Sequence, residues 1–146
     1  MLAASDTDNG RVREIYPSVL QPDDSIPSTA RTYLTQALQS LHAPAGGVML
    51  AASAVDAMLK AVGYVEGSLK ARIDQAARDH RITDEMALWA HDVRLDANDQ
   101  RHADQDATIP TEIDARRCVE FSLALAEFLF VLPDRVRRGR TPLPQP

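Results

Sequence analysis

The stretch from Val48 to Val62 constrains the fold more than any other part of the sequence. Its only polar side chains belong to Ser53, Asp56 and Lys60, which are spaced three and four residues apart. On an α-helix these residues share one narrow stripe, and the rest of the circumference is apolar. Such a helix needs other elements over most of its surface, so we expect a central helix surrounded by further helices.

Length and composition support a single all-α domain. The chain has 146 residues, of which 45% are hydrophobic and only 5% aromatic, and alanine is abundant. A chain of this length can bury one core but is too short for two ordinary domains, and its composition favours helices over strands. We therefore predict a single-domain, all-α antiparallel bundle of about five helices with short connections.

Local signals place the other helices around the central one. Serine and threonine are favoured caps, acidic residues are favoured in a first turn, and proline and glycine mark helix ends. Besides the central helix, we expect helices from Ser28 to before Pro44, from Leu69 to about His80, from a Thr83 cap to His102, and from a capping box at Thr111 to Leu132, where Pro133 stops the last one.

The two ends of the chain differ in composition from this body. Residues 1–24 are polar and interrupted by prolines, and we expect an extended N-terminal arm. The bundle is predicted to occupy residues 25–136. Residues 137–146 are rich in arginine and proline, and we expect a flexible tail.

Charge and cysteine content limit the compartment and the partners. The net charge of −5 disfavours broad binding to a phosphate backbone. Cys118 is the only cysteine, so no intrachain disulfide can form, which fits a reducing compartment. No secretory signal is visible at the N-terminus, and the longest apolar run is shorter than the roughly 20 residues of a membrane span. We expect a cytoplasmic protein without a membrane partner.

The segment "RLDANDQRH" concentrates hydrogen-bond donors. Arg94, Asn98 and His102 follow one another at intervals of four residues, and His91 lies three residues before the first of them. On one continuous helix these four residues share a face, while acidic residues point the opposite way. We expect this face to look inward, toward another helix or another subunit, where Asp56 or Glu120 could supply an acceptor.

Three runs of the sequence resemble a bacterial family of unknown function that is grouped with the HEPN superfamily of small helical bundles. They are "YLTQALQSLHAPAGGVMLAASAVDAMLKAVGY", "ITDEMALWAHDVRLDANDQRHAD" and "EFLFVLP", and the likeness extends from about Arg13 to Val136. The most specific part is the pattern of Arg94, Asn98 and His102.

The resemblance implies a helical homodimer whose polar residues meet at the interface and which, in active members, cleaves RNA without a metal ion. Related domains occur attached to restriction enzymes, which implies a nucleic-acid or defence context. The sequence departs from the pattern at three points. Ala97 stands where glycine is usual, Ala52 where many members carry an arginine, and the spacer before His102 is longer than in active members.

Two functions remain open at this point. The first is a non-catalytic interaction module in which the polar face specifies pairing, with an RNA or protein partner. The second is a metal-independent endoribonuclease in which His102 acts as base or acid, Arg94 or Arg101 holds phosphate and Asn98 positions it. Trp89 is a candidate for a rim or subunit contact or for packing against the N-terminal arm.

We predict neither a metal site nor a cofactor. The run that starts at Asp96 is similar to the start of a calcium loop, but Gln100 and Arg101 occupy a ligand position and the glycine position. His102, Asp104 and Asp106 are a weaker candidate set, for which a polar loop is the simpler explanation.

Overall fold

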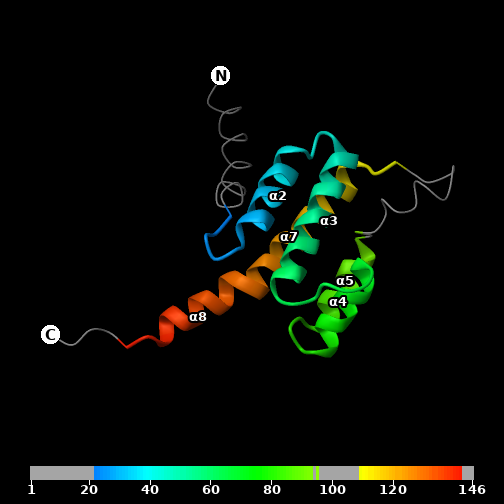
Figure 1. The fold of residues 1–146 in the computed structure, drawn as a ribbon. Helices are drawn as coiled ribbons and strands as arrows, with labels where there is room; N and C mark the ends of the chain where they lie inside the picture. Colours follow the sequence, from blue (N-terminus) through cyan, green and yellow to red (C-terminus); the bar gives the residue numbers. More distant parts are fainter. Residues whose placement is uncertain (1–21, 94, 96–108, 143–146) are drawn as a thin grey trace, which may run out of the picture.

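The computed structural model describes residues 22–93, 95 and 109–142, and every regular element in these residues is helical. The prediction of an all-α bundle is confirmed (Figure 1). The elements are α2 (Ser28–Gln39), α3 (Pro44–Ala61), α4 (Leu69–Arg78), α5 (Asp84–Asp92), α7 (Glu112–Ala126), the π-helix η1 (Glu127–Val131) and α8 (Leu132–Arg140). The last three form one continuous helical run.

The central helix is α3, which packs against both α2 and α7 (Figure 1). It begins at Pro44, four residues before the start that the apolar pattern indicates. Pro44 lies in the first turn, where a helix does not need the missing N–H, so it starts α3. Seven residues of α3 are buried: Gly47, Val48, Ala51, Ala54, Val55, Met58 and Leu59.

Helices α4 and α5 form a second, smaller pair at one end of α3. Ser68 caps α4 by accepting a hydrogen bond from the N–H of Ala71, and Thr83 caps α5 by accepting one from the N–H of Met86. Gly63, with φ of +101°, lets the chain turn directly after α3. The Thr83 cap is the one that the sequence predicts, whereas the Ser68 cap is found only in the structure.

The fourth helix is shorter than predicted. Helix α5 ends at Asp92, and the backbone N–H of Val93 closes its last turn. The carbonyl of Val93 accepts a hydrogen bond from the Cys118 thiol at 3.2 Å, which ties the end of α5 to α7. Leu95 is buried, whereas Leu88 is 62% exposed, so these two leucines do not share the apolar strip that a continuous helix would give them.

The last helical run is longer than predicted. Pro133 does not end it, because the proline lies in the first turn of α8, directly after η1. The N–H of Leu132 bonds to the carbonyl of Glu127, five residues back, and this wider turn accommodates the missing N–H of the proline. Helix α8 continues to Arg140, so the segment predicted as a flexible tail begins inside a helix.

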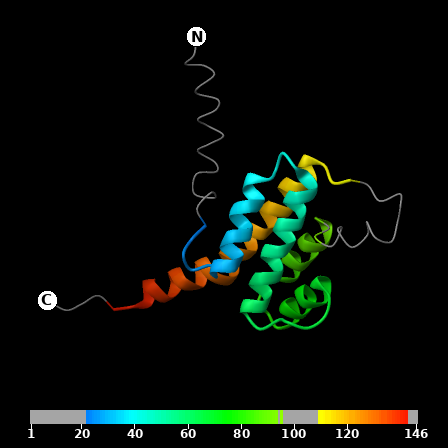
Figure 2. The same cartoon turned by 45° about the horizontal axis from the view of Figure 1, so that its top comes forward.

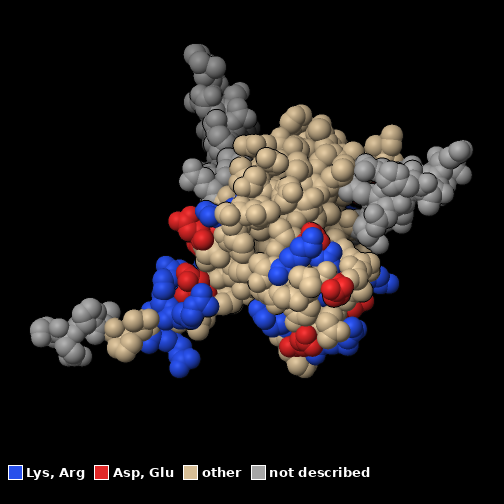
Figure 3. All heavy atoms as spheres, in the orientation of Figure 1, with Lys and Arg blue, Asp and Glu red and all other residues tan. Residues whose placement is uncertain are grey.

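Helix α8 extends away from the body of the molecule, and none of its residues is buried (Figures 1 and 2). Figure 3 shows basic side chains gathered on α8, whereas the surface over α2 and α3 is nearly free of charge. The sequence explains the uncharged surface, since no Asp, Glu, Lys or Arg occurs from Thr32 to Val55. None of the described helices has both the length and the apolar content of a membrane span.

The two adjacent glycines of α3 give a first test of the packing. A Cβ atom on Gly47 would lie 3.0 Å from the carbonyl oxygen of Ser40 and 3.3 Å from the Cβ of Ala115, whereas one on Gly46 would meet nothing within 4 Å. We expect Gly47→Ala to lower the free energy of unfolding by about 1 kcal/mol through overpacking. Gly46→Ala should raise it by about 0.5 kcal/mol, because alanine is the better helix former. Urea denaturation followed by circular dichroism measures both, and equal stabilisation by both variants would contradict the close contact.

Candidate functional site

Three of the residues singled out in the sequence lie in the described part of the chain, and each of them contacts α4 or α7. They are Asp56 on α3 and Trp89 and His91 on α5. The remaining candidates, Arg94, Asn98, Arg101 and His102, lie outside the described residues. Because α5 ends at Asp92, it does not provide the shared helical face on which Arg94, Asn98 and His102 were placed together with His91.

Asp56 is the centre of a charged cluster that joins α3 to α4. Its carboxylate lies 2.5 Å from Nη2 of Arg72 and 2.9 Å from Nζ of Lys60. The Arg72 side chain is only 9% exposed, whereas that of Lys60 is 54% exposed. Arg72 also donates to the carbonyl of Tyr64 at 3.5 Å, and its Nε finds no partner among the described residues. The cluster therefore anchors a buried guanidinium.

The charge state of Asp56 follows from these neighbours. Burial raises the pKa of its carboxyl, but the hydrogen bonds from Lys60 and Arg72 and their positive charges outweigh this effect. The pKa of Asp56 consequently lies below its usual value of 3.8. Asp56 is ionised at neutral pH and is unsuited to act as a general acid or base there.

His91 makes the second polar contact, between α5 and α4. Its Nε2 lies 2.8 Å from Oδ1 of Asp74, and the two side chains are 29% and 37% exposed. Since a carboxylate only accepts, Nε2 carries the shared proton. The histidine is thus half-buried and held by a partner within the same chain.

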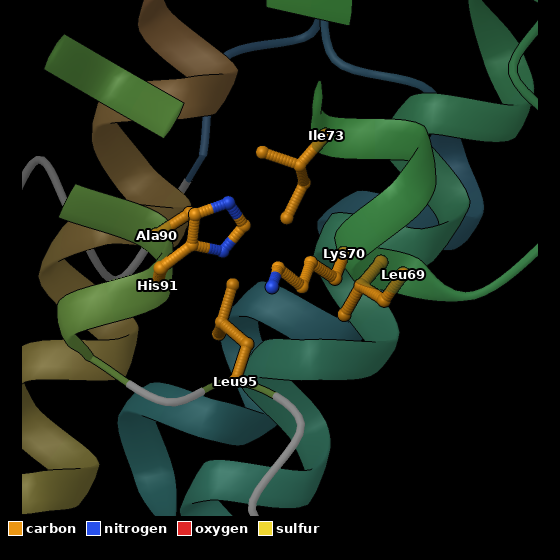
Figure 4. A pocket seen from close by; sticks show the side chains of 6 residues that line it. All are labelled: Leu69, Lys70, Ile73, Ala90, His91 and Leu95. Atoms are coloured by element: carbon orange, nitrogen blue, oxygen red, sulfur yellow. The ribbon is translucent and has the colours of Figure 1, made fainter. Parts of the chain in front are cut away.

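The space beside His91 is too small for a ligand. The side chains of α4 point toward His91 and Leu95 across a cavity of about 10 Å³, which is about the room of one water molecule (Figure 4). Leu69, Lys70, Ile73, Ala90, His91 and Leu95 line it. Among the described residues, this arrangement is a contact between α4 and α5 that leaves no room for a substrate.

Trp89 packs on α7, a contact that neither of its two sequence interpretations named. Its ring lies 5.3 Å from the ring of Phe121 at an angle of 84°, which is an edge-to-face contact. Phe121 is fully buried, while Trp89 remains 37% exposed. One side of the Trp89 ring therefore packs against α7, and the other side is exposed to solvent.

Cys118 is a structural residue of α7. Burial raises the pKa of its thiol to about 11, and the charge of Asp114 adds to this. The thiol stays protonated at neutral pH and donates to the carbonyl of Val93. A buried, protonated thiol is a poor nucleophile.

Sequence reasoning missed two members of these contacts, Arg72 and Asp74. Arg72 could have been suspected, because it lies between Leu69 and Ala76 on the apolar side of α4, where an arginine needs a buried acceptor. Asp74 gave no such signal. Its partner lies 17 residues away and is brought close only by the packing of α5 on α4.

The larger hollows in the described surface are open and hold no arrangement for catalysis. One of about 550 Å³ lies along α2, and one of about 450 Å³ lies beside the turn after α3. The second borders Arg72, which pairs with Asp56, and Arg78, which donates to Gln75 at 2.6 Å. Neither hollow is lined by a histidine or a cysteine. In the ranges that the structure describes, no three His, Cys, Asp or Glu side chains group to hold a metal ion.

Comparison with known proteins gives one match. A family model described as a domain of unknown function (DUF4145) matches residues 35–141. No curated protein and no solved structure matches the chain. The expectation of a family of unknown function is thereby confirmed, while the link to the HEPN superfamily stays a prediction.

The Asp56 cluster gives a second test. Asp56→Asn removes the charge that compensates the buried Arg72, and we expect the free energy of unfolding to fall by about 2 kcal/mol. Lys60→Gln removes only an exposed pair and should cost less than about 0.5 kcal/mol. Chemical denaturation of both variants measures the difference, and similar losses would show that Arg72 does not depend on Asp56.

The lowered pKa of Asp56 also predicts a pH dependence. A carboxyl with a lowered folded pKa contributes stability above its unfolded pKa, and the contribution is lost as the pH falls through the folded value. The difference in unfolding free energy between wild type and Asp56→Asn should therefore be constant at neutral pH. It should shrink as the pH falls below about 3.8. Denaturation curves at several pH values test this, and a difference that grew on acidification would contradict the assigned shift.

Proposed function

We infer the function of this chain from its own residues and from the sequence resemblance, because the family to which it belongs is described only as a domain of unknown function (DUF4145). We propose that it is a HEPN-like helical homodimer that acts as a non-catalytic interaction module in a nucleic-acid or defence-related context. This proposal joins the sequence resemblance to the contacts of the described residues.

One observation supports the non-catalytic part of the proposal: Asp56 and His91, two of the predicted interface residues, are each held by a partner within the same chain. Asp56 neutralises Arg72, and His91 pairs with Asp74 beside a cavity of about 10 Å³. Metal-free RNA cleavage needs a histidine or similar group that faces the substrate together with a cation for the phosphate. His91 and Asp56 serve the packing of α4 instead.

A second observation, the apolar side chains that the bundle leaves exposed, supports the homodimer. Eight large apolar side chains are exposed among the described residues, and four of them, Leu88, Trp89, Leu132 and Val136, lie on α5 and α8. Leu88 is 62% and Val136 is 50% exposed. Exposed apolar groups that are rimmed by polar residues are typical of protein interaction surfaces.

The test separates a module from a nuclease. We expect purified wild type to be a dimer by light scattering and to leave a mixed RNA pool intact in buffer that contains a chelator. Arg94→Ala and His102→Ala should lower stability or dimerisation. His42→Ala serves as the matched control, because His42 is exposed between α2 and α3.

The alternative gives a different result in the same experiment. If wild type cleaves RNA and the folded Arg94→Ala and His102→Ala variants do not, the chain is a metal-independent endoribonuclease. A wild type that is monomeric at high protein concentration would overturn the homodimer. Circular dichroism of each variant shows whether a lost activity reflects a lost fold.

A further inference from the structure

Helix α8 presents an apolar pair between arginines. Leu132 is 42% and Val136 is 50% exposed, and their spacing of four residues puts them on one face. Arg135 and Arg140 flank this face on its two sides, as the helical periodicity of 3.6 residues requires. Four arginines against one aspartate give α8 a formal charge of +3.

The arginines of α8 are held only by weak contacts. Arg135 lies 3.4 Å from Glu127, and Arg137 and Arg138 share Asp134 at 3.2 and 3.0 Å. The three arginine side chains are 63%, 72% and 66% exposed, and exposed pairs of this kind contribute little. The basic surface seen on α8 in Figure 3 is therefore available to a stronger acidic partner.

The outer face of α5 has the opposite character. Asp84, Leu88 and Asp92 follow one another four residues apart and are all exposed, with Leu88 at 62%. Glu85 and the open side of Trp89, which is 37% exposed, lie next to them. Three carboxylates and no lysine or arginine give α5 a formal charge of −3.

These two faces match in charge and in apolar content, but they do not meet within one chain. Helix α8 continues the run of α7 and η1, so its direction is fixed, and both views show it leaving the body on the side away from α5 (Figures 1 and 2). Two α8 helices would not pair well either, because each has a formal charge of +3. The α5 face of a second copy satisfies both conditions.

We propose that two copies of this chain exchange their α8 helices, so that the Leu132 and Val136 face of each α8 lies on the Leu88 and Trp89 face of the other copy's α5. The two contacts are equivalent, and the assembly closes as a twofold dimer. This inference rests on the proposed homodimer and names the surface that forms it. The apolar pair at the centre of the arginines favours a protein partner over a phosphate backbone, which offers no apolar surface on its exterior.

Charge reversal tests the contact from both sides. Arg135→Glu with Arg140→Glu makes α8 acidic, and Glu85→Lys with Asp92→Lys makes α5 basic. Each double variant alone should dimerise at least about 100-fold more weakly than wild type, because like charges then face each other. An equimolar mixture of the two double variants should dimerise again, since both contacts regain opposite charges.

The matched control is Arg116→Glu with Arg117→Glu, which makes the same charge change as in the α8 variant at two exposed positions in the first half of α7. It should dimerise like wild type. Light scattering and analytical ultracentrifugation over a range of concentrations measure all proteins, and circular dichroism confirms their fold. The wild-type dimer should also weaken in 1 M salt, where the screening length is about 3 Å.

The outcomes separate this inference from the proposed function. A dimeric wild type whose association survives both double variants would overturn the exchange of α8 and leave the homodimer in place. A monomeric wild type would overturn both. A dimer that survives while the α8 double variant loses binding to a labelled RNA would also overturn the exchange, and would assign the arginines to nucleic acid.

Discussion

The close approach of α3 to α2 and α7 is the contact on which the rest of the bundle depends. Glycine and alanine line it, and a Cβ on Gly47 would already crowd the backbone at Ser40 and the Cβ of Ala115. At this distance the buried Ser122 hydroxyl reaches the carbonyl of Ala51 on α3, as well as that of Cys118 one turn back. The small residues therefore bring the helices together, and the serine fixes their register with a polar bond inside the core.

The outer helices are attached to this core by contacts of a different kind. Arg72 and Asp56 join α4 to α3 through charge, Trp89 joins α5 to α7 through an aromatic edge, and Cys118 holds the end of α5. Polar and aromatic contacts have stricter geometry than apolar packing. They fix the orientation of the smaller helix pair, and through it the direction in which the acidic side of α5 faces.

The elements that the sequence predicted correctly are those whose signals are local. Thr83 caps α5, and the helix expected from Ser28 begins at that residue, because a helix start depends on a few neighbouring atoms. The two prolines show the limit of such signals. Pro44 begins a helix, and Pro133 lies inside a helical run. Whether a proline starts a helix, ends it or is accommodated within it depends on the backbone turn around its ring.

The end of α5 depends on Cys118, which is 25 residues distant, so no local pattern could place it. Of the candidate site, His91 was expected to find an acceptor and Asp56 was offered as one, but packing pairs His91 with Asp74 and Asp56 with Arg72 instead.

The π-helix η1 changes the direction in which the apolar stripe of α7 continues along α8. Leu125, Leu129, Leu132 and Val136 are spaced as one uninterrupted apolar stripe of an α-helix. The turn of η1 takes one more residue than an α-helical turn, and this rotates everything that follows by about 100° around the axis. Leu125 and Leu129 remain in the core, while Leu132 and Val136 are turned out to solvent. A single extra residue in one turn thus acts as a phase shift in the apolar stripe, whose last two side chains lie on a helix that leaves the body with no residue buried.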